Sequence, residues 1–146
     1  MKIFILEIRE RCEPLFYFGT LCFFASLVFL LLVNLSTTQI SGANAWIKPF
    51  KFALSIAIYS ITMAWLVWYL QHFNRFLFAW SIILLLGFEI VYIAMQAARG
   101  QLSHFNVSSP AYTALYGLMA VAATAVSVYT AYIGVLFFKY DFIAGM

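Results

Sequence analysis

Four runs of apolar residues, each long enough to cross the hydrocarbon core of a bilayer, limit what this chain can fold into. They cover residues 15–33, 46–70, 76–98 and 111–138. A core about 30 Å thick is crossed by roughly 20 residues of helix, and lipid cannot satisfy an unpaired backbone, so the runs are expected to be α-helices. Charged residues make up 9% of the chain, against about 25% in a soluble domain. The sequence therefore predicts a single all-α transmembrane domain, a four-helix bundle spanning residues 1–146.

The segments between the runs predict how the helices are joined. Residues 71–75 allow a short connection, so the second and third helices are expected to be antiparallel neighbours. Residues 34–44 are polar and turn-forming and predict a loop. Gly100 is placed to end the third helix in a left-handed cap. Ser109 followed by Pro110 predicts an N-cap and a first helical residue for the fourth helix.

Basic residues predict the orientation of the chain in the membrane. With both termini in the cytoplasm, the inner side carries five basic residues and the outer side three: Lys2, Arg9, Arg11, Arg75 and Lys139 against Lys48, Lys51 and Arg99. Lysine and arginine favour the cytoplasmic side, so we expect an N-in, C-in topology. Residues 1–13 mix apolar and charged side chains and predict a short N-terminal interfacial helix.

Polar residues inside the third run are the sharpest candidates for a functional site. Glu89, Tyr92, Gln96 and Arg99 recur at spacings of three, four and three, which puts them on one stripe of a helix. Ionisable groups within a span are costly and mark a functional site by default. We expect the stripe to face protein rather than lipid, with Glu89 as an ion or proton site. The alternative is a protonated Glu89 that hydrogen-bonds Tyr92 or a serine of another helix.

Two segments on the expected outer side add to this stripe. The second helix opens with Lys48 and Lys51, and the loop after the third helix holds His104 and Asn106. Because the second and third helices are neighbours, we expect four side chains to converge at an outer mouth above Glu89: Lys51, Gln96, Arg99 and His104. The lysines and the arginine would bind an anion there.

Each of these outer residues also has a structural explanation. Lys48 and Lys51 can extend towards lipid headgroups, and Arg99 can cap the carbonyl end of its helix. His104 stands alone on its side, because His72 is expected on the opposite face. A lone histidine is more often a hydrogen-bonding loop residue than a metal or haem ligand, so no cofactor is predicted.

Small residues recur on one face of the fourth helix and predict close helix packing, either within the chain or between subunits of a homo-oligomer. They are Gly117, Ala120, Thr124, Ser127, Ala131 and Gly134.

Cys12 and Cys22 are too far apart along the predicted topology to pair, and we expect both to be free. The scattered basic residues form no face for nucleic acid, which leaves the lipid bilayer, a second copy and a small ion or anionic ligand as expected partners.

Two motifs resemble a family of bacterial integral membrane proteins that are usually labelled uncharacterised. The first is W-x-K-P-x-K-F, matched here by Trp46, Lys48, Pro49, Lys51 and Phe52. The second is Q-A-x-R-G-x-x-S-H-F-N, which begins at Gln96 and follows Glu89. The resemblance covers under half of the chain and implies a multi-pass protein of the bacterial inner membrane. It carries no activity, but it supports treating the two segments as one unit.

Three functions are compatible with these features. The first is a small channel, transporter or ligand-binding protein whose polar site opens to the extracytoplasmic side above an intramembrane carboxylate. The second is a membrane enzyme acting on a lipid or isoprenoid phosphate, although no nucleophile motif or metal-ligand set supports it. The third is a non-catalytic subunit of a membrane complex. We expect the first.

Overall fold

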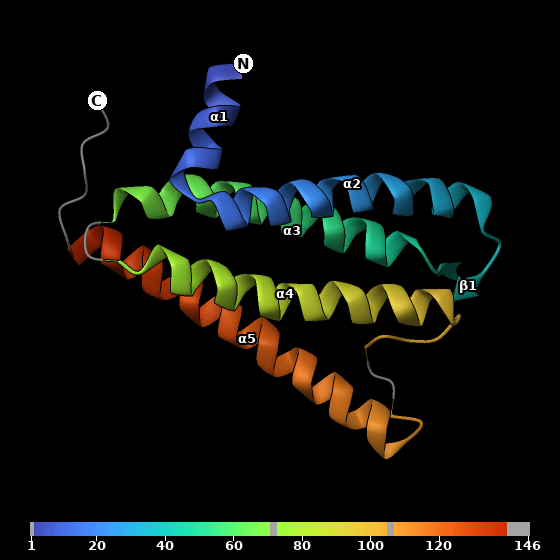
Figure 1. Ribbon diagram of the computed structural model, residues 1–146. Helices are drawn as coiled ribbons and strands as arrows, with labels where there is room; N and C mark the ends of the chain where they lie inside the picture. The colour runs from blue at the N-terminus through green and yellow to red at the C-terminus, as the bar shows by residue number, and fades with distance from the viewer. Residues whose placement is uncertain (1, 71–72, 105–106, 140–146) are drawn as a thin grey trace.

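The computed structural model describes residues 2–70, 73–104 and 107–139, and most of them are helical (Figure 1). In chain order the elements are α1 (Lys2–Arg11), α2 (Glu13–Leu35), β1 (Gln39–Ile40), β2 (Ala43–Asn44), α3 (Ile47–Leu66), the 3-10 turn η1 (Val67–Tyr69), α4 (Arg75–Ala98) and α5 (Pro110–Lys139). Within the described residues, four segments have the length and hydropathy of membrane spans: α2, α3 with η1, α4 and α5. The predicted all-α four-helix bundle is thereby confirmed.

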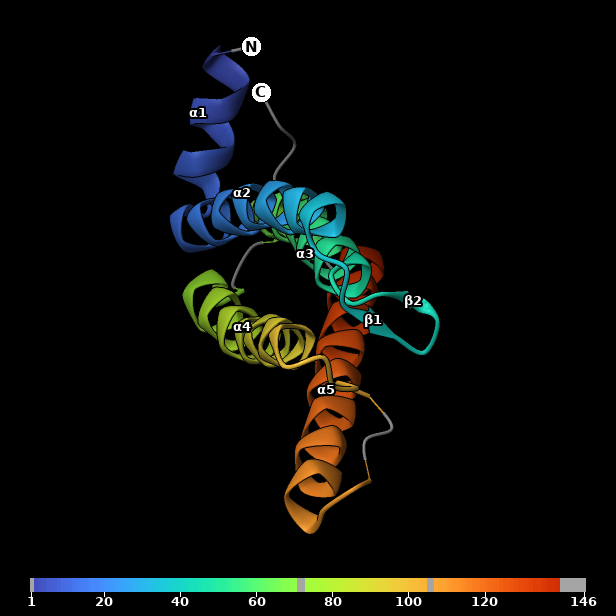
Figure 2. The same ribbon diagram turned by 90° about the vertical axis from the view of Figure 1, so that its right-hand side faces the viewer.

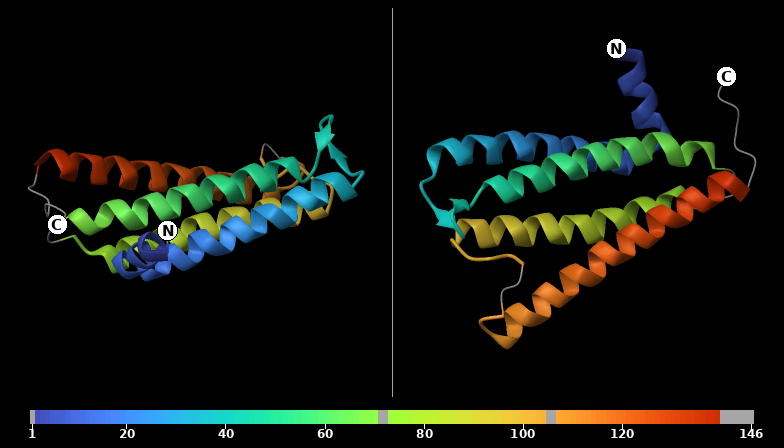
Figure 3. Two further views of the ribbon diagram at one scale, coloured as in Figure 1. Left: turned by 90° about the horizontal axis from the view of Figure 1, so that it is seen from above. Right: turned by 180° about the vertical axis from the view of Figure 1, so that it is seen from behind.

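Helices α2, α3 and α4 run back and forth along one direction, which we call the bundle axis, and α5 crosses them obliquely (Figure 1). The β1–β2 hairpin and the segment that leaves α4 lie at one end, which we call the loop end. The start of α2 and the last residues of α5 lie at the opposite end (Figure 3). This arrangement is the one that an N-in, C-in topology requires, and the side that faces the cytoplasm remains a prediction of the basic-residue bias.

The first helix, α1, stands at a steep angle to the bundle axis (Figure 1). Ile8 is buried against the bundle, and the guanidinium of Arg11 lies 3.6 Å from the centroid of the Trp65 ring. Arg11 also pairs with Glu7 at 2.6 Å. A helix in this position, with an Arg and a Trp at its base, suits the interfacial region of a bilayer.

Small residues bring α2 and α3 into close contact. The buried members are Gly19, Cys22 and Ser26 on α2 and Ala53, Ala57, Ser60 and Ala64 on α3. A Cβ atom at Gly19 would lie 3.0 Å from Cγ1 of Ile61 and 3.2 Å from the carbonyl oxygen of Ala57. The close packing expected for the last span is therefore found between the first two, where the backbones approach most closely because a side chain is absent.

The small residues of α5 do not pack inside the chain. Gly117, Ala120 and Thr124 are exposed, and a Cβ added at Gly117 or Gly134 would meet nothing within 4 Å. Towards the loop end α5 leans away from the other helices (Figure 2), and Met119 is the first of its side chains to be buried. Of the two forms of packing expected for this face, packing within the chain is wrong, and a homo-oligomer remains a prediction.

Residues 34–44, expected as a loop, contain structure of their own. α2 continues to Leu35, and β1 and β2 form an antiparallel hairpin in which Gln39 faces Asn44. Ser41 and Gly42 have φ of 51° and 82°, as a two-residue type I′ turn requires at its two central positions. Asn44 donates to the carbonyl oxygens of Val33 at 3.0 Å and Ser36 at 2.7 Å, so it fixes the hairpin to the end of α2.

Hydroxyl groups along α3 behave in two ways. Thr62 donates to the carbonyl oxygen of Ile58 at 2.7 Å, as expected for a hydroxyl inside a span. Ser60 differs, because its buried Oγ has no hydrogen-bond partner among the described residues. Ser60 lies at the close contact with Gly19, where its Cβ would be 3.2 Å from an added Cβ.

We expect Gly19→Ala to destabilise the protein by about 1–3 kcal/mol, because the new methyl group has to displace the backbone of α3. Gly87→Ala is the matched control. Gly87 also lies within a span, but its added Cβ would meet Phe18 at an ordinary 3.8 Å. Because alanine has the higher helix propensity, the Gly87→Ala variant should be at least as stable as the wild type. Thermal unfolding in detergent measures both variants. Equal melting temperatures for the two would show that α2 and α3 are not held at this distance.

Candidate functional site

The loop end begins with a well-formed helix terminus on α4. Gly100 has φ of 64°, its N–H donates to the carbonyl oxygen of Ala97 at 3.1 Å, and the N–H of Gln101 donates to that of Gln96 at 2.9 Å. These two bonds form a Schellman motif, which confirms the predicted left-handed cap. The cap turns the chain sharply, so residues 101–104 fold back beside the first turn of α3.

A pocket of about 410 Å³ opens where this returning chain meets α3 and the hairpin. The hairpin, the first turns of α3 and the end of α4 contribute to its wall, which includes Ile40, Ser41, Ala43, Asn44, Ala45, Ile47, Lys48, Pro49, Lys51, Phe52, Ile93, Ala97, Gln101, Leu102 and Ser103. We call it the loop-end pocket. Its size and its mainly apolar wall with a few polar groups are typical of a small-molecule site.

Lys48 and His104 form the main polar contact at this pocket. Nζ of Lys48 lies 2.8 Å from Nδ1 of His104, and Oγ of Ser103 lies 3.2 Å from the same nitrogen. A lysine ammonium can only donate, so Nδ1 is the acceptor and the imidazole carries its proton on Nε2. Lys48 is half-buried and held by this bond, rather than extended towards headgroups.

The surroundings of His104 favour its neutral form. Burial lowers the pKa of the imidazole below its ordinary value, and the positive charge of Lys48 lowers it further. The ring also lies 6.1 Å from that of Phe52 and 6.3 Å from that of Tyr116, measured between centroids. His104 is thus a hydrogen-bonding loop residue, and the described residues contain no group of three His, Cys, Asp or Glu side chains that could hold a metal ion.

Below the pocket, the stripe on α4 is buried as expected for most of its length. Glu89 is 4% exposed, Tyr92 3% and Gln96 1%. Nε2 of Gln96 donates to the hydroxyl of Tyr92 at 3.3 Å and to the carbonyl oxygen of Leu102 at 3.1 Å. Gln96 therefore ties the stripe to the loop.

Glu89 occupies a distinctive place on this stripe. It forms no hydrogen bond or ion pair with any residue that the structure describes, so the expected alternative of a bond to Tyr92 is not found. It lies four residues, about 6 Å along the axis, below Ile93 of the pocket wall. An intramembrane carboxyl group thus sits one helical turn beneath the loop-end pocket.

The four side chains expected to converge at an outer mouth do not all meet at the loop-end pocket. Lys51 lines the pocket, but Lys48, not Lys51, contacts His104. Arg99 is exposed and absent from the pocket wall, because α4 ends at Ala98 and Arg99 is the cap residue. Asn106, the last expected site residue, lies outside the described residues, as do His72 and Phe105.

Sequence reasoning missed the part of the wall that the hairpin supplies. Ser41 and Asn44 line the pocket, and so does Gln101 beyond the cap. The Ser41–Gly42 pair was a turn signal, but strands of two residues are too short to show alternation. Gln101 could have been included because it follows the predicted cap directly.

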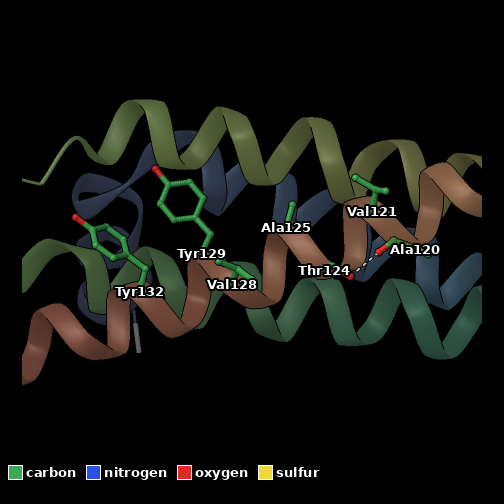
Figure 4. Close-up of a pocket in the computed structure, with 7 residues that line it drawn as sticks. All are labelled: Ala120, Val121, Thr124, Ala125, Val128, Tyr129 and Tyr132. Carbon is green, nitrogen blue, oxygen red and sulfur yellow. Dashed lines mark hydrogen bonds between the residues drawn. The ribbon is translucent and has the colours of Figure 1, made fainter.

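Two further hollows differ from the loop-end pocket in chemistry. One, of about 400 Å³, lies between α3, α4 and α5 and is lined by Lys51, Phe52, Ser55, Ile56, Tyr59, Leu86 and Val126; we call it the side groove. The other, of about 750 Å³, is lined by α5 alone (Figure 4). Its Thr124 hydroxyl already donates to the carbonyl oxygen of Ala120, so this larger surface offers lipid-facing side chains and few groups for binding.

We expect acid to weaken the loop end through His104. The pKa of its imidazole is lowered in the folded protein. The neutral imidazole therefore stabilises the fold fully above the ordinary histidine pKa of about 6.5, and this contribution is lost as the pH falls below that value. Protonation removes the acceptor for Lys48 and places two cations together. The melting temperature should fall between about pH 7.5 and pH 5 in the wild type. The His104→Gln variant keeps a hydrogen-bond acceptor that does not titrate, so its melting temperature should fall less over the same pH range. Identical pH profiles for the variant and the wild type would contradict this role of His104.

A scan against protein-family models, a search of curated proteins and a search of solved structures find no match to this chain.

Proposed function

We propose that this membrane protein binds a small anionic ligand in the loop-end pocket. The observation that carries the proposal is the pair of lysines, Lys48 and Lys51, in the wall of one ligand-sized pocket. Apart from Glu89, the sequence has no Asp or Glu between residues 14 and 140. The described wall of the pocket contains no Asp or Glu, and neither lysine forms an ion pair with a carboxylate among the described residues.

The remaining groups of the pocket fit such a ligand. Ser41, Asn44 and Gln101 offer hydroxyl and amide groups, while Ile47 and Phe52 offer apolar surface. Lysine is a strong point-charge partner for phosphate and carboxylate. A ligand with one anionic group and an apolar part would use both kinds of wall. The same chemistry would suit an enzyme acting on a lipid phosphate, but binding requires no catalytic group and is the simpler conclusion.

We expect Lys48→Gln and Lys51→Gln each to weaken binding of butyl phosphate by roughly tenfold, the scale of a lost hydrogen bond to a charged group. Titration calorimetry of the purified protein in a neutral detergent measures this. Lys139→Gln, at the opposite end of the bundle, is the matched control and should bind as the wild type does. Binding that is absent in the wild type, or equal in all four proteins, would refute the proposal.

Transport of the bound anion is a second candidate function, and Glu89 is the observation that favours it. A buried carboxyl group without a partner among the described residues is costly inside a span. Its place one turn below the pocket suits a group that takes up or releases a proton when the ligand moves.

We expect Glu89→Gln to keep the fold, with a free energy of unfolding within about 1 kcal/mol of the wild type, because the shape is preserved and Glu89 forms no hydrogen bond with a residue that the structure describes. Uptake of radiolabelled butyl phosphate into proteoliposomes should then lose its dependence on pH. A strong loss of stability would instead indicate a structural role for Glu89, as in a subunit of a larger complex. Uptake with an unchanged pH profile would remove Glu89 from the transport function.

A further inference from the structure

The loop-end pocket and the side groove adjoin each other. Lys51 and Phe52 belong to the walls of both. The two hollows are of similar size, about 410 and 400 Å³. They differ in character, because the pocket is formed by the loop end and the groove by three membrane-spanning helices. Lys51 therefore stands where the loop-end pocket meets the side groove.

The side groove runs from this boundary into the depth of the membrane. Lys51, Ser55 and Tyr59 lie on one side of α3, and eight residues of helix correspond to about 12 Å. At the deep end the hydroxyl of Tyr59 lies 2.7 Å from Oγ1 of Thr130, which joins α3 to α5. Above this contact α5 leans away from the bundle towards the loop end (Figure 1, Figure 3). The groove thus follows α3 from Lys51 to Tyr59, where the contact with Thr130 marks its deep end.

We propose that the ligand is a single-chain amphiphile, whose anionic headgroup lies in the loop-end pocket and whose hydrocarbon chain lies in the side groove. The inference rests on the proposed binding of an anion by Lys48 and Lys51, and it adds the chemical class of that ligand. A hydrocarbon chain attached to a headgroup beside Lys51 enters the groove in the direction that lipid chains already take in a leaflet. The apolar side chains of Ile56, Leu86 and Val126 would line it there.

The dimensions of the groove favour a hydrocarbon chain over a helix of another protein. A helix with its side chains is about 10–12 Å across, which is too wide for a hollow of about 400 Å³ set between three helices. The lysine at its mouth supplies the charge that a headgroup requires. An uncharged lipid would leave Lys51 without a partner among the lining residues, none of which is acidic.

Two probes separate the headgroup from the chain: butyl phosphate, which fits the pocket alone, and dodecyl phosphate, which also reaches the groove. Binding is measured with radiolabelled probe in phosphatidylcholine nanodiscs, with empty nanodiscs subtracted. Ser55→Trp fills the groove with an indole ring. This variant should weaken the binding of dodecyl phosphate by about 3- to 10-fold, the scale of packing contacts in membranes. The binding of butyl phosphate should be unchanged. Ile58→Trp, on the lipid-facing side of α3, is the matched control and should change neither.

A photoreactive group at the end of the dodecyl chain provides a second measurement that needs no substitution. Crosslinks should form with Tyr59, Val126 and their neighbours, and excess dodecyl phosphate should suppress them. Crosslinks confined to lipid-facing residues, or equal binding of dodecyl phosphate by both tryptophan variants, would overturn the proposed chain site while the anion site stands. If butyl phosphate also fails to bind the wild type, the proposed function itself fails.

Discussion

The close contact between α2 and α3 fixes the part of the molecule on which the candidate site depends. Gly19 lets the two backbones approach until an added methyl group would touch the carbonyl oxygen of Ala57. Interhelical contact of this kind is a main source of stability in a bilayer, where burying apolar side chains against lipid yields little. Because α3 is held in this way, its first turn is presented at a fixed depth. Lys48 lies in that turn and Lys51 at the start of the next.

The second constraint is the termination of α4 at the same end. Its Schellman motif returns the chain towards α3, and Gln96 holds the returning segment through the carbonyl oxygen of Leu102. Asn44 performs the corresponding task for the hairpin by bonding the end of α2. The loop-end pocket is thus enclosed by loops whose backbones are fixed to helix ends. This is the arrangement that places loop residues such as His104 reproducibly.

The elements that depend on local chemistry could be predicted from the sequence. The four spans follow from length and hydropathy, and the caps at Gly100 and Ser109 follow from residues that act within one turn. Oγ of Ser109 accepts from the N–H of Tyr112 at 3.3 Å, as an N-cap does. The burial of Glu89 and Gln96 also follows from their shared stripe. In each case the residues that predict the feature lie within a few positions of it in the sequence.

Features that depend on helix rotation and on non-local packing could not be predicted. Whether Lys48 or Lys51 meets His104 is decided by how α3 is turned about its axis, which residue spacing alone does not specify. The small residues of α5 formed the longer periodic series, yet the shorter series around Gly19 makes the contact. The difference is that the α2 residues face a second series of small residues on α3. Close packing needs both partners, and one helix shows only half of the pattern.

The helix walls of the two hollows differ in how firmly they are held, and this bears on how a ligand would enter. Lys51 and Phe52 belong to α3, which is packed against α2, whereas Val126 belongs to α5, much of which is exposed. Below the groove α5 is fixed by the bond between Thr130 and Tyr59 and by the packing of Tyr129 on Phe78, with ring centroids 5.0 Å apart. Its opposite end leans away from the bundle (Figure 2). A movement of α5 about this lower attachment would widen the side groove towards lipid without displacing the lysines. If the proposed ligand binds as described, the lysines that would select it sit on α3, which is packed against α2, and the helix that would move to admit it is α5.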